Sequence, residues 1–281
     1  YYITMSSNRL ILKFLLFFFI VINLSSCSTI EGWLPDKIDE TKTWSASKLY
    51  SEAKYELNDG DYKTAIDYYE KLEARFPHGK YAQQAQLEIA YAYYRFEEPE
   101  SAIAATERFI KLHPKHRYVD YAYYLRGLVS FPSRKSVFEY IWPQDESKRD
   151  TQGSMESFRY FEQLISRFPN SIYAQDSALR MRYLRNKIAK HQLHVAEFYM
   201  RQKAYLAAAN RAKEIVQHYP KTPAVMEALT IMVEAYQKLD LLDLAKDAQE
   251  VYKLNEGKFV DDIYLKQKSV IPYLPDWMRP D

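Results

Sequence analysis

The chain has 281 residues and a formal net charge of +2, so it lacks the strongly basic field with which general nucleic-acid-binding proteins hold phosphates. Six glycines are too few for a β protein rich in turns, and a single cysteine excludes an internal disulfide, so the fold must be stabilised by packing. The 26 tyrosines recur at helical rather than strand spacing, which favours an all-α protein.

The first 26 residues predict a secretory signal peptide. Arg9 precedes an apolar stretch from 10 to 24 that has Lys13 near its start, and small residues close the segment. That stretch is shorter than the roughly 20 apolar residues that a membrane-spanning helix needs. We expect residues 1–26 to be removed from the mature protein, and Met5 to be the true start, because the four residues before it carry no pattern.

The residues Leu24-Ser25-Ser26-Cys27 resemble the bacterial lipobox, in which an aliphatic and two small residues precede a cysteine. The resemblance implies cleavage before Cys27, a diacylglyceryl group on its thiol and an acyl chain on its new amino group. Two or more acyl chains anchor a protein stably where one does not. Ser28 follows where an aspartate would indicate the inner membrane, so the expected location is the periplasmic face of the outer membrane. The alternative is an uncut anchor helix with an incidental buried cysteine.

A repeat begins near residue 45. Small residues and prolines recur at spacings of twelve in three sets: Ala53, Ala65 and Pro77; Ala90, Ala102 and Pro114; Ala196, Ala208 and Pro220. Two antiparallel helices approach closely only where small side chains cross, and a proline disfavours helix in the residue before it. This spacing resembles the tetratricopeptide repeat, a pair of antiparallel helices.

The third and fourth units are longer than the others. In the third, Gly127 and Ser157 take the two small positions and are 30 residues apart instead of 12, which implies about 18 inserted residues within about residues 131–152. A length of 18 residues is unusual for a helix connection, so the insertion is either a partner surface or a variable loop. The fourth unit contains either an added helix or one helix of about 30 residues from Tyr173 to Gln202.

A fifth unit, in which Val233 and Ala245 take the crossing positions, completes the array. The sequence therefore predicts an all-α tetratricopeptide-repeat solenoid of about five helix pairs, from 45 to 255. We expect residues 27–44 to form an extended tether that carries the lipid. Residues 256–281 are rich in proline, break the repeat and are expected to form an irregular tail.

An array of this kind has a concave face that the first helix of each pair lines. The inward positions of the repeat fall on these residues: Tyr50, Lys54, Gln84, Tyr91, Tyr94, Arg95, Tyr121 and Tyr124. Tyrosine offers contact area at low entropic cost and keeps a hydroxyl for the backbone of a bound strand. The pattern thus predicts a binding groove, and the alternative is that about half of these tyrosines pack between repeats.

No catalytic constellation is recognisable, so we expect no enzyme. His191 and His194 lie three apart on a predicted helix, and Glu197 is the nearby third ligand type, but a solvated helix face explains them better than a metal. Walker, dinucleotide and nucleophile-elbow motifs are missing from the sequence. We therefore expect no metal and no cofactor other than the lipid on Cys27.

Several stretches resemble the BamD family of outer-membrane assembly lipoproteins, also called ComL. They are RFPHGKYAQQAQLEIAYAYY, FIKLHP, DYAYYLRGL, DESKRD, FPNSIYAQDSALRMRYLRNKIA, VAEFYMRQKAYLAAANRAKEIVQHYP and TPAVMEAL. The resemblance covers residues 20 to 255 and includes the third-unit insertion and the lengthened fourth unit.

The resemblance implies a role in inserting β-barrel proteins into the outer membrane. Its expected partners are the periplasmic domains of the insertase BamA, other lipoproteins of that complex and the C-terminal signals of unfolded barrels. Residues 45–170 would engage substrate and residues 171–255 would bind BamA. In the AANRA motif, Arg211 would pair with a BamA carboxylate, with Asn210 beside it. The alternative is a periplasmic scaffold for cell-wall or division enzymes.

Overall fold

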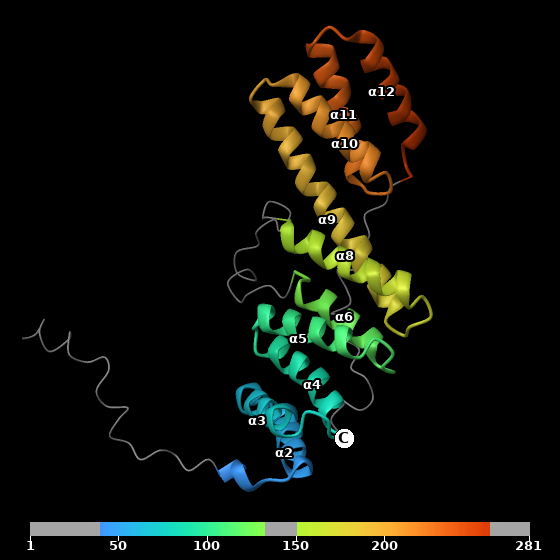
Figure 1. The fold of residues 1–281 in the computed structure, drawn as a ribbon. Helices are drawn as coiled ribbons and strands as arrows, with labels where there is room; N and C mark the ends of the chain where they lie inside the picture. The colour runs from blue at the N-terminus through green and yellow to red at the C-terminus, as the bar shows by residue number, and fades with distance from the viewer. Residues whose placement is uncertain (1–39, 133–150, 259–281) are drawn as a thin grey trace, which may run out of the picture. The chain divides into compact units, whose positions relative to one another are not determined.

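A computed structural model of the protein describes residues 40–132 and 151–258 (Figure 1). Over these ranges the chain forms ten α-helices and one 3-10 helix. The elements are η2 (Glu40–Thr43), α2 (Ala46–Asp59), α3 (Tyr62–Arg75), α4 (Ala82–Arg95), α5 (Pro99–Leu112), α6 (Val119–Val129), α8 (Gln152–Arg167), α9 (Ala174–Arg201), α10 (Tyr205–His218), α11 (Ala224–Lys238) and α12 (Leu242–Asn255).

Several predicted features fall outside the described residues. They are the signal peptide, Cys27, most of the insertion and most of the tail. The end of the predicted tether differs from expectation, because residues 40–43 form η2 rather than an extended chain. No helix in the two described ranges combines the length and apolar character that crossing a membrane requires.

The helices pack as five antiparallel pairs: α2 with α3, α4 with α5, α6 with α8, α9 with α10, and α11 with α12. Each pair also contacts the next one along the chain, as the succession of colours in Figure 1 shows. This arrangement confirms the predicted all-α solenoid of tetratricopeptide type. The insertion lies within the third pair, between α6 and α8, as the spacing predicted.

The predicted small residues lie where paired helices meet. Six of them are fully buried: Ala53, Ala65, Ala90, Ala102, Ala196 and Ala208. The closest approach is at Gly127, where an added Cβ would lie 2.5 Å from a ring carbon of Phe161. The Ser157 hydroxyl donates a hydrogen bond of 2.8 Å to the Gly127 carbonyl, so both small residues of the third pair contribute to its contact.

In the fifth pair, the residue buried where the two helices meet differs from the predicted one. Val233 is only partly buried, whereas Ala235 and Tyr236 lie in one buried cluster with Ala209 and Ala245. The prediction of Val233 as the crossing residue was therefore wrong. A branched side chain is too bulky for the closest approach of two helices, and the alanine two residues later takes the buried position.

Local signals set the ends of the first pair. The Ser45 side chain accepts a hydrogen bond of 3.2 Å from a backbone N–H of the first turn of α2. Gly60 ends that helix with φ of 93°, a left-handed conformation that residues with a Cβ adopt at a cost. Asp61 then caps α3 through a 3.1 Å bond. The two helices are thereby joined by a short turn.

The fourth unit contains one long helix, which decides between the two alternatives that the sequence left open. Helix α9 has 28 residues, a length of about 42 Å at 1.5 Å per residue. Near its start, the Tyr183 ring lies 5.6 Å from Phe131, which follows α6. Further on, Leu193 and Ala196 pack against Ile215 of α10. The helix thus contacts both the third pair and the C-terminal pairs.

Candidate functional site

Three of the predicted groove residues converge on a buried carboxylate. The Glu88 side chain in α4 is fully buried. Its Oε1 accepts hydrogen bonds from the Tyr50 hydroxyl at 3.0 Å, the Lys54 ammonium at 3.2 Å and the Gln84 amide at 3.4 Å. Its Oε2 accepts a hydrogen bond from the Tyr69 hydroxyl. We call these five residues the Glu88 cluster, which ties α2, α3 and α4 together.

The Glu88 cluster is close to electrically neutral. A buried carboxylate is tolerated only when it is paired and hydrogen-bonded, and the Lys54 ammonium and the hydroxyls meet that need. Burial, reinforced by the Glu88 charge, raises the pKa of both the Tyr50 and the Tyr69 hydroxyls. Both phenols therefore keep the protons that they donate.

An aromatic surface that the sequence reasoning missed lies beside the Glu88 cluster. The Tyr81 ring stacks on the Tyr50 ring at 4.9 Å between centroids and 20° between planes. The Lys80 ammonium lies 4.7 Å from the centroid of Tyr81. Tyr81 precedes α4 in the loop, so the helical spacing that identified the other tyrosines did not include it.

A second group lies on the same face of α4. Arg95 follows Glu88 by seven residues, so two turns separate them along one side of the helix. The Arg95 guanidinium donates a 2.7 Å hydrogen bond to the Tyr91 hydroxyl and lies 4.9 Å from the Tyr62 ring centroid. Tyr94 and Arg95 reach solvent, whereas Tyr91 is only 6% exposed. Tyr91 thus holds Arg95 in place.

Besides the buried Tyr91, two further predicted groove residues do not line a surface. Tyr121 and Tyr124 in α6 are both fully buried. The Tyr124 ring stacks on Tyr173 at 4.8 Å, and its hydroxyl donates a 2.6 Å hydrogen bond to Asp176 at the start of α9. The prediction was wrong for this pair, because the extended fourth unit brings its own side chains over the inward face of α6.

The AANRA motif lies on α10 with its alanines inward. Ala209 and Ala212 are fully buried, whereas Asn210 is exposed and the Arg211 side chain is 43% exposed. Arg211 donates a 3.0 Å hydrogen bond to Glu214 one turn further on. An exposed pair at this spacing contributes only about 0.2–0.5 kcal/mol, so a partner's carboxylate could replace Glu214.

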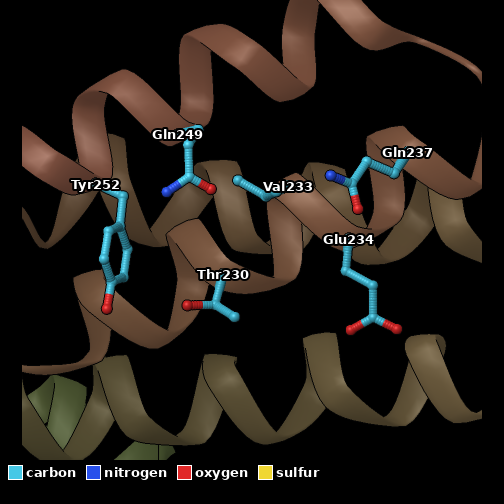
Figure 2. Close-up of a pocket in the computed structure, with 6 residues that line it drawn as sticks. All are labelled: Thr230, Val233, Glu234, Gln237, Gln249 and Tyr252. Carbon is cyan, nitrogen blue, oxygen red and sulfur yellow. The ribbon is translucent and has the colours of Figure 1, made fainter.

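A polar cleft between α11 and α12 has a volume of about 430 Å³ (Figure 2). Its lining residues are Thr230, Val233, Glu234, Gln237, Gln249 and Tyr252. The α11 members recur at helical spacing along one face. Sequence reasoning named only Val233 among the lining residues, as a crossing residue, and did not predict a cleft here. The amides and hydroxyls of this lining both donate and accept hydrogen bonds, and the Glu234 carboxylate adds a negatively charged acceptor.

A smaller cleft of about 230 Å³ lies along α9. Its lining residues are His191, His194, Val195, Phe198 and Tyr199. The His194 ring lies 3.2 Å from the Glu197 carboxylate, so these two side chains interact with each other. Over the described residues, no three His, Cys, Asp or Glu side chains are grouped so that they could hold a metal ion.

Comparison with known proteins identifies the family. The model of the YfiO family, described as outer membrane lipoprotein, matches residues 42–252. The outer membrane protein assembly factor BamD of Neisseria meningitidis serogroup B is 43% identical over 254 residues, which cover 90% of this chain and 94% of the relative. The BamD of Vibrio cholerae is 37% identical over 232 residues, covering 83% and 93% respectively. The chain therefore belongs to the BamD family of outer membrane protein assembly factors.

Proposed function

We propose that this assembly factor is a non-catalytic adaptor anchored by lipid to the periplasmic face of the outer membrane. Its N-terminal pairs hold the C-terminal signal of an unfolded barrel protein, and its C-terminal pairs hold the insertase BamA. The observation that carries the proposal is the partly exposed N-terminal surface formed by Tyr50, Tyr81, Tyr94 and Arg95 in a member of this family. Other lipoproteins of the machinery complete the set of partners.

This N-terminal surface suits a strand of variable sequence. Aromatic rings provide contact area with few rotatable bonds, and an arginine stacks on rings or binds carbonyl and carboxylate groups. Arg95 is already held by Tyr91 and Tyr62, so little entropy is lost when it binds. Recognition of this kind tolerates substitutions in the substrate, as a factor that serves many barrels requires.

Tyr94→Ala should weaken binding of a peptide from the C-terminus of a barrel protein by about fivefold or more, as expected for an aromatic contact worth 1 kcal/mol. Tyr94 is preferable to Tyr91 for this test, because Tyr91 is buried and its loss would also disturb packing. Fluorescence anisotropy with a labelled peptide measures the affinity.

The matched control is Tyr55→Ala, which removes another tyrosine from the N-terminal pairs. Tyr55 is 65% exposed and lies five residues after Tyr50, on a different side of α2. We expect this variant to bind the peptide as the parent does. Equal affinity of the Tyr94 variant and the parent, with unchanged circular dichroism, would exclude Tyr94 from the binding surface.

The C-terminal pairs supply the proposed BamA site. Arg211 and Asn210 are adjacent on the outer side of α10, while neighbouring alanines fill the core. A guanidinium can bind a carboxylate with two parallel hydrogen bonds, and Asn210 can bind a backbone group alongside. Arg211 and Asn210 lie in a different helix pair from the N-terminal tyrosines. The proposed BamA site and the proposed substrate site therefore belong to different helix pairs.

The proposed anchor is Cys27. Mass spectrometry of the protein purified from membranes should find a mature N-terminus at this residue, with a diacylglyceryl group on sulfur and an acyl chain on nitrogen. Cys27→Ser should remove both the diacylglyceryl group and the processed N-terminus at this residue, because the serine hydroxyl does not replace the thiol that carries the lipid. An unmodified, uncleaved N-terminus on the native protein would contradict the proposed anchor.

A further inference from the structure

We infer that Arg95 binds the C-terminal carboxylate of the unfolded barrel protein, so that the N-terminal surface recognises the free end of its substrate. The inference rests on the proposed function for the location of the ligand and goes beyond it by assigning the chemical group that Arg95 binds. A terminal carboxylate is shared by all C-terminal signals whatever their sequence. A receptor for this group therefore suits a factor that serves many barrels.

Tyrosines rather than a carboxylate hold Arg95 in place. Its guanidinium donates a 2.7 Å hydrogen bond to the Tyr91 hydroxyl and lies 4.9 Å from the Tyr62 ring centroid. Across residues 40–132 and 151–258, no aspartate or glutamate forms an ion pair with this exposed side chain. The bond to Tyr91 uses one of five N–H donors, so the others can bind a ligand.

Two other arginines of the N-terminal pairs have a carboxylate partner within the fold. Arg108 pairs with Glu73 at 2.9 Å, and Arg126 pairs with Glu107 at 3.4 Å. Both arginines are therefore engaged in contacts between helices. Arg95 differs from them because its contacts are with tyrosines, which fix the guanidinium without cancelling its charge.

The surroundings of Arg95 do not repel an anion. Its bond to Tyr91, one turn earlier in α4, directs the guanidinium away from the carbonyl groups at the end of that helix, which carry partial negative charge. Asp61 precedes Tyr62 in the chain, but it is engaged by another residue. Its carboxylate accepts hydrogen bonds from the Thr64 N–H at 3.1 Å and from the Thr64 hydroxyl at 2.7 Å.

A guanidinium and a carboxylate are both planar and can form two parallel hydrogen bonds, which an amide end cannot replace. Tyr62 and Tyr94 are partly exposed, and their rings provide apolar contact area near the guanidinium. The ligand that fits this combination is the last residue of a chain, with an aromatic side chain on the rings and its free carboxylate on Arg95.

Three synthetic peptides test this assignment. The first is the aromatic-ended C-terminus of a barrel protein with a free carboxylate, and the second has the same sequence with an amide at its end. The third has the amide end and an additional aspartate at its N-terminus, so its net charge equals that of the first. Fluorescence anisotropy at 0.05 M salt measures the affinities.

The parent should bind the free carboxylate about threefold to tenfold more tightly than either amide, as expected for a charged hydrogen-bonded pair at an exposed site. Arg95→Gln should bind all three peptides equally. Arg95→Lys should show an intermediate preference, because lysine keeps the charge without the parallel hydrogen bonds. A preference that persists in Arg95→Gln would overturn the inference.

The matched control is Arg108→Gln, which removes an arginine that already has a carboxylate partner and whose side chain is 54% exposed. This variant should keep the parent preference. Partial unfolding lowers the affinity for all three peptides by the same factor, so the ratio of affinities reports on recognition of the end group alone.

The remaining outcomes separate the inference from the proposed function. Equal binding of the free carboxylate and the amide by the parent would overturn the inference, while the proposed substrate surface would stand because both peptides bind. Equal binding of the first and third peptides would show a response to net charge and would also overturn it. Failure of all three peptides to bind would refute the proposed substrate surface together with the inference.

Discussion

Arg211→Glu should abolish co-purification of BamA with the tagged protein. The substitution places a negative charge where the proposed partner offers a carboxylate, so an attraction becomes a repulsion and the partner's charge is left unpaired. Loss of one member of a buried, hydrogen-bonded charge pair costs about 2–5 kcal/mol, which corresponds to roughly 30-fold or more in affinity. The partly exposed position of Arg211 means that the fold of the variant should be preserved.

Two controls on the same helix make this test specific. Lys213→Glu makes the same change in charge at an exposed position of α10 and should retain BamA. Glu214→Gln removes the carboxylate that Arg211 pairs with in the free protein. The BamA carboxylate then no longer competes with Glu214 for the guanidinium, so BamA should be retained at least as well as by the parent. Parental recovery of BamA with the Arg211 variant would remove this residue from the interface.

Gly127→Ala should lower the free energy of unfolding by about 1–3 kcal/mol, the usual cost of overpacking a core. The added methyl would lie 2.5 Å from a ring carbon of Phe161, closer than two carbon atoms can approach. The ring cannot withdraw easily, since Phe161 is fully buried and neighbours Tyr124 and Phe131. Equilibrium unfolding in urea, followed by circular dichroism, measures the change.

Gly153→Ala is the matched control for this prediction. Gly153 lies in α8 of the same helix pair, but an added methyl there would meet only the Ser130 carbonyl, at an ordinary contact distance of 3.6 Å. We expect unchanged stability or a gain of up to about 1 kcal/mol, because alanine favours helix over glycine. Equal stabilities of the two variants would show that the α6–α8 contact does not require a glycine.

The helix pairs could be predicted because each depends on residues that are close in the chain. Ala53 of α2 and Ala65 of α3 are only twelve residues apart, and small side chains recur at this regular spacing wherever the two helices of a pair cross. The same reasoning failed at Val233, because spacing alone does not say which neighbouring residue a helix buries. It also did not decide whether the region of α9 forms one long helix or two helices, because the residue spacing gives only the extra length of this unit.

The site was harder to predict because its contacts join residues of different repeats. The Tyr50 hydroxyl bonds to Glu88, which lies 38 residues later, and the Tyr124 hydroxyl bonds to Asp176, 52 residues later. Spacing placed both tyrosines on the inward face of a helix, but only the packing of later helices leaves Tyr50 partly exposed and buries Tyr124. Tyr81 was missed because it lies in a loop.

The most direct test of the proposed adaptor role is a pull-down of the tagged, full-length protein from membranes solubilised in a gentle detergent. We expect the dominant partner to be a large β-barrel protein with periplasmic domains, together with other lipoproteins of the machinery. Mass spectrometry of the eluate identifies these partners. Recovery of peptidoglycan or division enzymes without a barrel protein would contradict the account.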